Sequence, residues 1–199
     1  GGMMLTFDEA NHKYFDGDVE LPSVTILVSI LGSDIDESLD DVMDVAADRG
    51  TTCHKVLELL LQGETELDYP TMYEPYVDAI RLFLSEHEIT PIAIETPIHS
   101  AVRGVAGTPD LLCMYDGVLT ITDWKFVSQV CKPKVKAQIN WYRDMYNESG
   151  VFPEQLIIVQ FLNNGLYRIY PVAISDTEFL ACYEIYKIKT NRYGKGKID

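Results

Sequence analysis

Two aspartates and a lysine fall on one face of a predicted β-hairpin. Asp110 precedes one β-rich run, Asp123 and Lys125 end the next run, and Asp116-Gly117 lies between them. An Asp-Gly pair in this position predicts a two-residue hairpin loop. In the register that this loop sets, Asp110 lies opposite Asp123, and the two-residue period of a strand brings Lys125 to the same face.

This face carries the residue types that phosphodiester hydrolysis needs. Like charges directly opposite each other destabilise a sheet, so a divalent cation held by Asp110 and Asp123 is the simplest expectation. Carboxylate oxygens suit Mg²⁺ or Mn²⁺, and the backbone carbonyl of Trp124 can complete the shell. Lys125 can position or deprotonate the attacking water, or offset charge at the phosphorus. The alternative is a surface hairpin with an Asp123–Lys125 ion pair.

Two further candidates depend on neighbouring elements. Glu95 faces Asp110 if the strand before the hairpin folds back through a loop centred on Val102-Arg103. The alternative for Glu95 is an ordinary exposed strand residue. His54 lies within a predicted helix, with Glu58 one turn later on the same face. A single helical histidine is more often structural than a ligand, so His54 is a candidate only together with the hairpin.

A polar helix face is predicted after the hairpin. Gln138 and Tyr142 are four residues apart and share this face, with Lys134 one turn earlier. The face can hold a DNA backbone or hydrogen-bond Lys125, and Lys136 adds to the basic cluster around it. Ordinary helix packing by Tyr142 is the alternative.

The elements that position these residues follow in the order helices, three strands, helix, two strands, helix. Periodicity predicts helices over 40–62, 72–87, 133–147 and 175–187, and strands over 92–99, 107–115, 118–125, 156–162 and 167–172. A hairpin over 5–20 and a short helix over 22–31 precede them. The first long helix can break at Gly50 or at Thr51-Thr52. The predicted fold class is α/β (α+β), a central mixed sheet flanked by helices.

Composition indicates one globular domain over residues 1–199. Hydrophobic residues make up 47% and charged residues 24%, as is usual for water-soluble proteins. Gly1-Gly2 before Met3 resembles a remnant of expression, and 3–31 form the N-terminal hairpin and short helix. Neither a membrane span nor a signal peptide is recognisable, so a cytoplasmic protein with no membrane partner is expected.

The charge is strongly negative and uneven. The net charge is −15, which by itself argues against nucleic acid as a partner. Residues 1–100 carry 21 acidic and 4 basic residues, whereas residues 101–199 carry 10 and 12. Phosphate contacts would therefore come from the basic clusters over 132–143 and 187–197.

The remaining cysteines and histidines are expected to be structural. The cysteines are scattered and unpaired in sequence, which favours reduced, mostly buried thiols: Cys53, Cys113, Cys131 and Cys182. The histidines outside the candidate site are His12, His87 and His99.

Four motifs together resemble the PD-(D/E)XK nuclease superfamily, in particular its RecB-like and phage exonuclease branch. In chain order they are a Gly-x-x-x-His motif over 50–54, a Gly-x-x-Asp motif at Gly107-Thr108-Pro109-Asp110, a (D/E)-x-K motif at Asp123-Trp124-Lys125, and a Gln-x-x-x-Tyr motif over 138–142. The opening segment over 5–25 also resembles phage-encoded members. Each motif is common by chance, but four in order are a specific signal.

The resemblance implies a restriction-endonuclease-like core and Mg²⁺- or Mn²⁺-dependent hydrolysis of DNA. It implies metal ligands at His54, Glu95, Asp110 and Asp123, with Lys125 as the catalytic lysine. The motif positions also imply that Gln138 and Tyr142 support the site and contact DNA. Further candidates for DNA contact or site support are Arg49, which precedes the first motif, and Lys134 and Lys136 of the basic cluster. Relatives with an iron–sulfur cluster carry three cysteines after the nuclease core, where this chain has only Cys182, so no cluster is expected.

The expected function is an exonuclease acting on linear or single-stranded DNA ends in recombination, repair or phage replication. Such a bacterial or phage-encoded enzyme can act with a single-strand-annealing protein or as a homo-oligomer. The alternatives are a non-catalytic DNA-end or protein-binding module on the same fold, and a structure-specific endonuclease.

Overall fold

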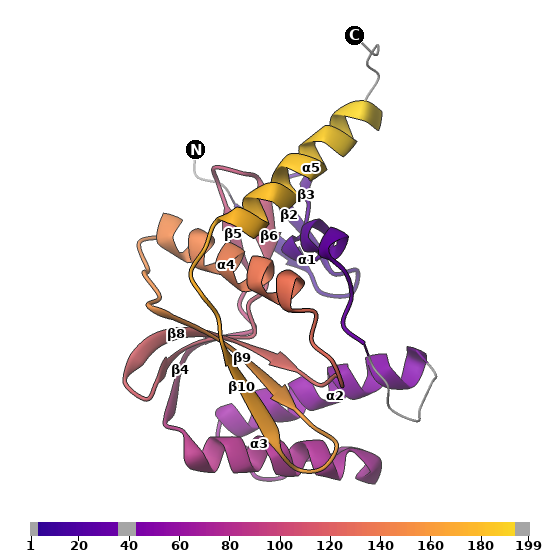
Figure 1. Ribbon diagram of the computed structural model, residues 1–199, viewed down its shortest axis with the longest axis vertical. Helices are drawn as coiled ribbons and strands as arrows, with labels where there is room; N and C mark the ends of the chain where they lie inside the picture. Colours follow the sequence, from indigo (N-terminus) through magenta and orange to yellow (C-terminus); the bar gives the residue numbers. More distant parts are fainter. Residues whose placement is uncertain (1–3, 36–42, 194–199) are drawn as a thin grey trace.

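A five-stranded sheet forms the centre of the molecule, in the strand order β10-β9-β8-β7-β4 (Figure 1). The computed structural model describes residues 4–35 and 43–193. The sheet strands are β4 (Ile89–Ile94), β7 (Leu111–Tyr115), β8 (Val118–Lys125), β9 (Gln155–Phe161) and β10 (Tyr167–Pro171). Strands β8 and β9 pair in parallel and all other neighbours are antiparallel. The predicted mixed sheet is confirmed.

Helices cover both faces of this sheet. Figure 1 shows α2 (Met43–Leu61) and α3 (Glu74–Glu86) on one face and α4 (Lys132–Glu148) on the other. The last helix, α5 (Thr177–Tyr193), packs on α4 and continues beyond the expected end near Lys187. Since parallel neighbours need a crossover, α4 is the connection that carries the chain from β8 to β9. None of the helices in the described ranges is long and apolar enough to cross a membrane.

Strand alternation divides the interior into two cores. Ile121, Leu156 and Ile158 point toward α4, whereas Trp124 and Val159 point toward α2 and α3. Asp123 and Lys125 have the same parity as Ile121, so they belong to the face that α4 covers. Asp123 and Lys125 thus follow Ile121 on the same face of β8, at the end of the strand where the apolar residues stop.

The hairpin register is the one predicted. Leu112 pairs with Ile121 and Met114 with Leu119, as the two-residue loop requires. Both loop residues have positive φ, 46° at Asp116 and 84° at Gly117. Such values are those of the hairpin turns that favour Asp-Gly.

The prediction of a single strand over 92–99 is wrong. The segment forms β4 and a separate strand β5 (Ile98–Ser100), which pairs with β6 (Val105–Gly107) through the loop at Val102-Arg103 that the sequence predicted. Glu95 lies at the break with φ of 44°. Pro97 has no N–H to give to a ladder and restricts the residue before it, so the chain leaves the central sheet here.

The N-terminal residues form a small antiparallel sheet beside the main one. Its strands are β1 (Leu5–Asp8), β2 (Lys13–Asp16) and β3 (Val19–Leu21). The short helix α1 (Val24–Val28) follows, and the Ser23 hydroxyl caps it by accepting a hydrogen bond from the Ile26 N–H. Tyr14 anchors the small sheet, since its hydroxyl lies 2.7 Å from the Thr108 hydroxyl.

Two short 3-10 turns lie between helices. The turns are η1 (Ser29–Leu31) and η2 (Thr71–Tyr73). Helix α2 continues through Gly50 and Thr51-Thr52 without a break. The expected start of α2 at Asp40 lies outside the described residues. The same holds for Gly1-Gly2 and for the end of the basic cluster at Lys195 and Lys197.

Candidate active site

The two strand aspartates meet where β7 begins and β8 ends. Asp110 directly precedes Leu111, the first residue of β7, and its Oδ2 accepts a hydrogen bond of 2.7 Å from the backbone N–H of Trp124. The Lys125 Nζ lies 3.0 Å from the Asp123 Oδ2. This oxygen is buried, and the lysine ammonium neutralises its charge. The predicted juxtaposition of two acids and a lysine is present.

Helix α2 brings His54 to Asp110. The His54 Nδ1 lies 2.8 Å from the Gly50 carbonyl oxygen one turn earlier. A carbonyl can only accept, so Nδ1 carries the proton and Nε2 faces the site. Nε2 lies 3.4 Å from the Asp110 Oδ2, and the ring packs edge-on against Phe126. The Gly-x-x-x-His spacing therefore orients the imidazole through one backbone carbonyl.

Glu95 reaches the site because of the break after β4. Its backbone N–H donates a 3.0 Å hydrogen bond to the Asp110 carbonyl oxygen, which continues the antiparallel register by one residue. Its side chain lines the same cleft as those of His54, Asp110 and Asp123. The predicted position of Glu95 opposite Asp110 agrees with the structure, although the strand around it does not.

The crowded charges shift the proton affinities of these groups. Burial raises the pKa of Glu95 to about 8, and the Asp110 charge adds to the effect. Burial also raises the pKa of Asp123 to about 7, because the attraction of Lys125 offsets it only in part. Burial alone would lower the pKa of His54, but the Asp110 carboxylate raises it to about 9.

The remaining two groups are held in their charged forms. Burial opposes ionisation of Asp110, yet His54 and Lys125 hold its pKa below the ordinary value. Burial also opposes the charge on Lys125, and Asp123 and Asp110 more than compensate, so its pKa is raised. A buried lysine that stays protonated can offset negative charge on a substrate, but it cannot serve as a base near neutral pH.

Helix α4 supplies the floor of the site. The Gln138 Nε2 donates a 3.1 Å hydrogen bond to the Tyr142 hydroxyl, and both side chains line the cleft. The Gln138 Oε1 is buried without a hydrogen-bond partner among the described residues. Tyr142 packs against Gly107, where an added Cβ would lie 2.7 Å from the tyrosine Cε1. The glycine of the Gly-x-x-Asp motif thus leaves room for the tyrosine of the last motif.

Other predicted residues lie outside the cleft. Arg49 is only 3% exposed, donates to the Phe126 carbonyl oxygen, and lies over the Tyr76 ring. It can support the strand end that carries Lys125, but burial prevents a contact with DNA. Lys136 also points away from the cleft, because its Nζ pairs with Glu178 of α5 at 2.5 Å.

Two more predicted positions contribute little to the cleft surface. Lys134 is partly exposed one turn before Gln138, and it is not part of the cleft wall. The Trp124 side chain is buried toward α3, so only its backbone faces Asp110.

The site lies in a cleft of about 840 Å³ whose outer wall the sequence did not predict. The small N-terminal sheet forms this wall with Phe7, Glu9, His12 and Tyr14. Sequence reasoning assigned His12 a structural role because no local pattern relates it to Asp110. The relation is tertiary and depends on the Tyr14–Thr108 contact.

The residues present fit a divalent cation by donor type. Asp123 and Asp110 both line the cleft and offer hard carboxylate oxygen donors. Within the described ranges, no three His, Cys, Asp or Glu side chains are already gathered as a metal-binding group. Mg²⁺ is compatible with this arrangement, because it is usually held by one or two carboxylates and keeps several waters.

Comparison with known proteins gives distant structural matches only. No model of a known protein family matches the chain, and no curated protein matches it. An alkaline exonuclease of Laribacter hongkongensis, LHK-Exo, has a similar structure over 86% of this chain and 94% of that chain, with 16% identity and a TM-score of 0.41.

Two further structures match at a similar level. The same exonuclease in complex with dAMP covers 87% of this chain and 92% of that chain, with 15% identity and a TM-score of 0.33. The protein SSO0001 covers 88% and 78%, with 11% identity and a TM-score of 0.39. Two of these three structures are of an exonuclease, and at these values the likeness carries no functional conclusion for this chain.

Proposed function

We propose that this chain is a Mg²⁺- or Mn²⁺-dependent deoxyribonuclease that degrades DNA from its ends. The observation that carries the proposal is the buried group of Asp110, Asp123 and Lys125, which places two carboxylates beside one ammonium in the cleft. The two carboxylates repel each other in this buried position, so a bound cation would stabilise the arrangement. A cation held by Asp110 and Asp123 would activate water and polarise the phosphate.

The side chains have separate roles in this proposal. The Lys125 ammonium offsets the negative charge that develops on the phosphate oxygens. His54 keeps Asp110 ionised and oriented, and Glu95 lines the same cleft, where its carboxyl group would be a further ligand for the cation. Gln138 and Tyr142 form the floor of the cleft, on which the substrate would lie.

Degradation of linear duplex DNA with Mg²⁺ or Mn²⁺ tests the proposal. We expect EDTA and Asp110→Ala to abolish the loss of DNA, and Lys125→Ala to slow it about 100- to 1,000-fold. Lys136→Ala is the matched control, because this lysine is also ion-paired but lies outside the cleft. Equal rates for Lys125→Ala and Lys136→Ala would contradict the assignment.

A non-catalytic binding module is the second candidate. It is favoured by the net charge of −15 and by the ion pairing of both lysines that line the described cleft. This candidate predicts binding of DNA ends or of a protein partner with no turnover in either metal. A third possibility is a structure-specific endonuclease. A circular duplex distinguishes it, because such an endonuclease cuts the circle and an exonuclease does not.

A further inference from the structure

Two aromatic side chains form a rim on the outer wall of the cleft. Phe7 of β1 stacks on Tyr14 of β2, with ring centroids 4.7 Å apart and an angle of 26° between the planes. His12 meets Phe7 edge to face at 5.4 Å. Both Phe7 and His12 line the cleft that contains Asp110 and Asp123. We call the Phe7–His12 pair the aromatic ledge.

The turn between β1 and β2 holds the ledge in place. The Asp8 side chain accepts hydrogen bonds from the Asn11 backbone and from the Asn11 side chain, at 3.1 and 2.7 Å. The chain then passes through His12 with φ of 54°, a left-handed conformation in which histidine is more common than most other residues. The turn therefore fixes the backbone that carries the exposed His12 ring.

The ledge is also fixed relative to the acidic residues. Tyr14 lies beneath it, is 2% exposed, and is held at the Thr108 hydroxyl two residues before Asp110. A movement of the rings away from the aspartates would therefore break the contact between the small sheet and the segment that joins β6 to β7.

The charges of the cleft limit how it can hold a nucleic acid. Five acids line its described part: Glu9, Glu58, Glu95, Asp110 and Asp123. The lysines that line the same part are Lys55 and Lys125, and both are ion-paired at 3.0 Å. Apart from a bound cation, such a surface offers little attraction to a phosphate backbone, so groups that do not rely on charge would add affinity. Stacking of bases on aromatic rings supplies affinity of this kind.

We propose that the aromatic ledge stacks an unpaired nucleobase and thereby selects single-stranded or frayed ends for the site. A base within a duplex has no free face, whereas an unpaired base can leave its neighbours and stack on Phe7 and His12. This inference rests on the proposed function, because it names the form of DNA that the nuclease takes.

Fluorescence of 2-aminopurine tests the inference without any cleavage. The base is placed at the end of a single-stranded oligonucleotide and titrated with the protein, with Ca²⁺ in place of Mg²⁺. The variants are Phe7→Leu, which keeps an apolar side chain over Tyr14, and His12→Asn, which tolerates positive φ. We expect each to weaken binding about 5- to 150-fold and to remove the quenching of the terminal base.

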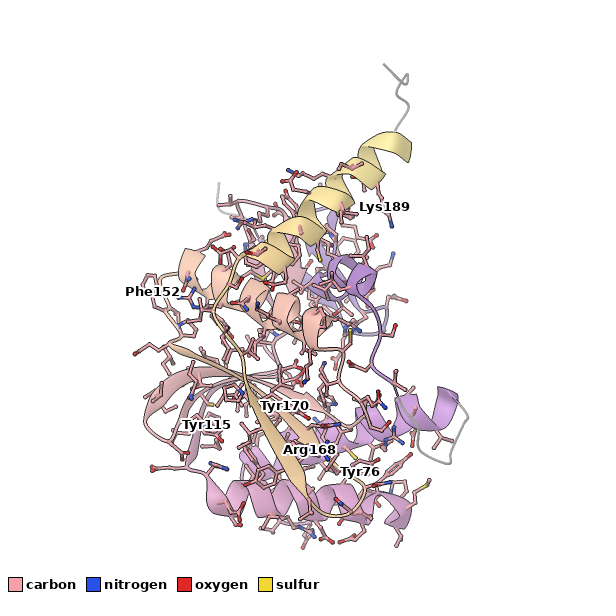
Figure 2. All side chains as sticks on the ribbon, in the orientation of Figure 1. Tyr76, Tyr115, Phe152, Arg168, Tyr170 and Lys189 are labelled. Atoms are coloured by element: carbon pink, nitrogen blue, oxygen red, sulfur yellow. The ribbon has the colours of Figure 1, made fainter. Side chains whose placement is uncertain are left out.

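Phe152→Leu is the matched control. Phe152, labelled in Figure 2, is 63% exposed and lies just before β9. The first residue of β9 pairs with Thr120, which lies toward the opposite end of β8 from Lys125, so Phe152 is distant from the site along the sheet. We expect this variant to bind like the wild type, and a blunt duplex with clamped ends to bind weakly to all four proteins. Phe7→Leu and His12→Asn proteins that quench and bind like Phe152→Leu would overturn the proposal.

The outcome can be separated from that of the proposed function. If the wild type cleaves DNA and the ledge variants keep the same affinity and end preference, the ledge has no role and the nuclease stands. If the wild type binds single strands through the ledge but cleaves in neither metal, the nuclease assignment fails and the ledge stands.

Discussion

Gly107 and Tyr142 depend on each other at the floor of the cleft. A Cβ at position 107 would lie 2.7 Å from the tyrosine ring and 3.2 Å from the Val24 Cγ2. The ring cannot give way easily, because it is buried and its hydroxyl is hydrogen-bonded to Gln138. The glycine is therefore needed for space and not for an unusual backbone angle.

We expect Gly107→Ala to lower the free energy of unfolding by about 1–3 kcal/mol, as overpacking does in other cores. It should also displace Tyr142 and reduce cleavage. Urea denaturation measures the loss of stability, and the intrinsic fluorescence of the folded state reports the displacement of Tyr142. Stability equal to that of the wild type would show that α4 is free to shift.

The ionisable residues of the site should make the metal-free protein less stable as the pH rises. For Glu95 and Asp123 the folded pKa values of about 8 and about 7 exceed the ordinary 4.5 and 3.8. The folded state then binds more protons than the unfolded state between these limits, so stability falls as the pH rises through them. His54 adds a loss of the same sign from 6.5 to about 9.

In EDTA we expect the melting temperature to fall by at least ~3 °C between pH 5 and pH 8. Glu95→Gln should flatten the profile, because a neutral amide replaces the carboxyl that must ionise. A melting temperature that rises over this interval would contradict the pKa shifts. Calorimetry at matched ionic strength is the suitable measurement.

At the scale of elements, the Asp116-Gly117 turn sets the register that brings Asp110 to Asp123. Gly117 has φ of 84° and open space around the position of a Cβ, so a substitution there tests conformation without steric overlap. Gly50 is a matched glycine in α2 with equally open surroundings and helical backbone.

We expect Gly117→Ala to destabilise the protein by about 1–2 kcal/mol, the cost of placing a Cβ in a left-handed conformation. Gly50→Ala should have the opposite sign and stabilise by about 0.5–1 kcal/mol, because alanine favours the helix. Thermal denaturation of both variants gives the comparison. Since both positions have room for a Cβ, effects of the same sign would contradict the role of backbone conformation.

The sequence predicted the elements that local chemistry determines. The hairpin register followed from one turn, and the α4 face followed from the spacing of Gln138 and Tyr142. The pattern did not predict the break after Ile94, because β-rich residues continue across it on both sides of Pro97. The aromatic ledge was out of reach, since a tertiary contact between Tyr14 and Thr108 creates it.

At the scale of the whole molecule, the sheet separates two hydrophobic cores and leaves the site at one end of both. His54 approaches from the α2 side and Gln138 from the α4 side. The strands between them carry Asp110, Asp123 and Lys125. Every layer of the fold thus contributes to one cleft, which is why the motifs are spread over so much of the chain.

The β7–β8 hairpin and the parallel β8–β9 pair have different requirements during folding. The hairpin joins neighbouring residues through two turn residues, whereas β9 reaches β8 only after the whole of α4 has been traversed. Local contacts form quickly and distant pairings slowly. We therefore expect the two aspartates to meet early, while water still screens them, and the cost of burying their charges to fall on the last steps. In stopped-flow experiments, Gly117→Ala should then slow refolding, whereas Gly107→Ala should mainly speed unfolding.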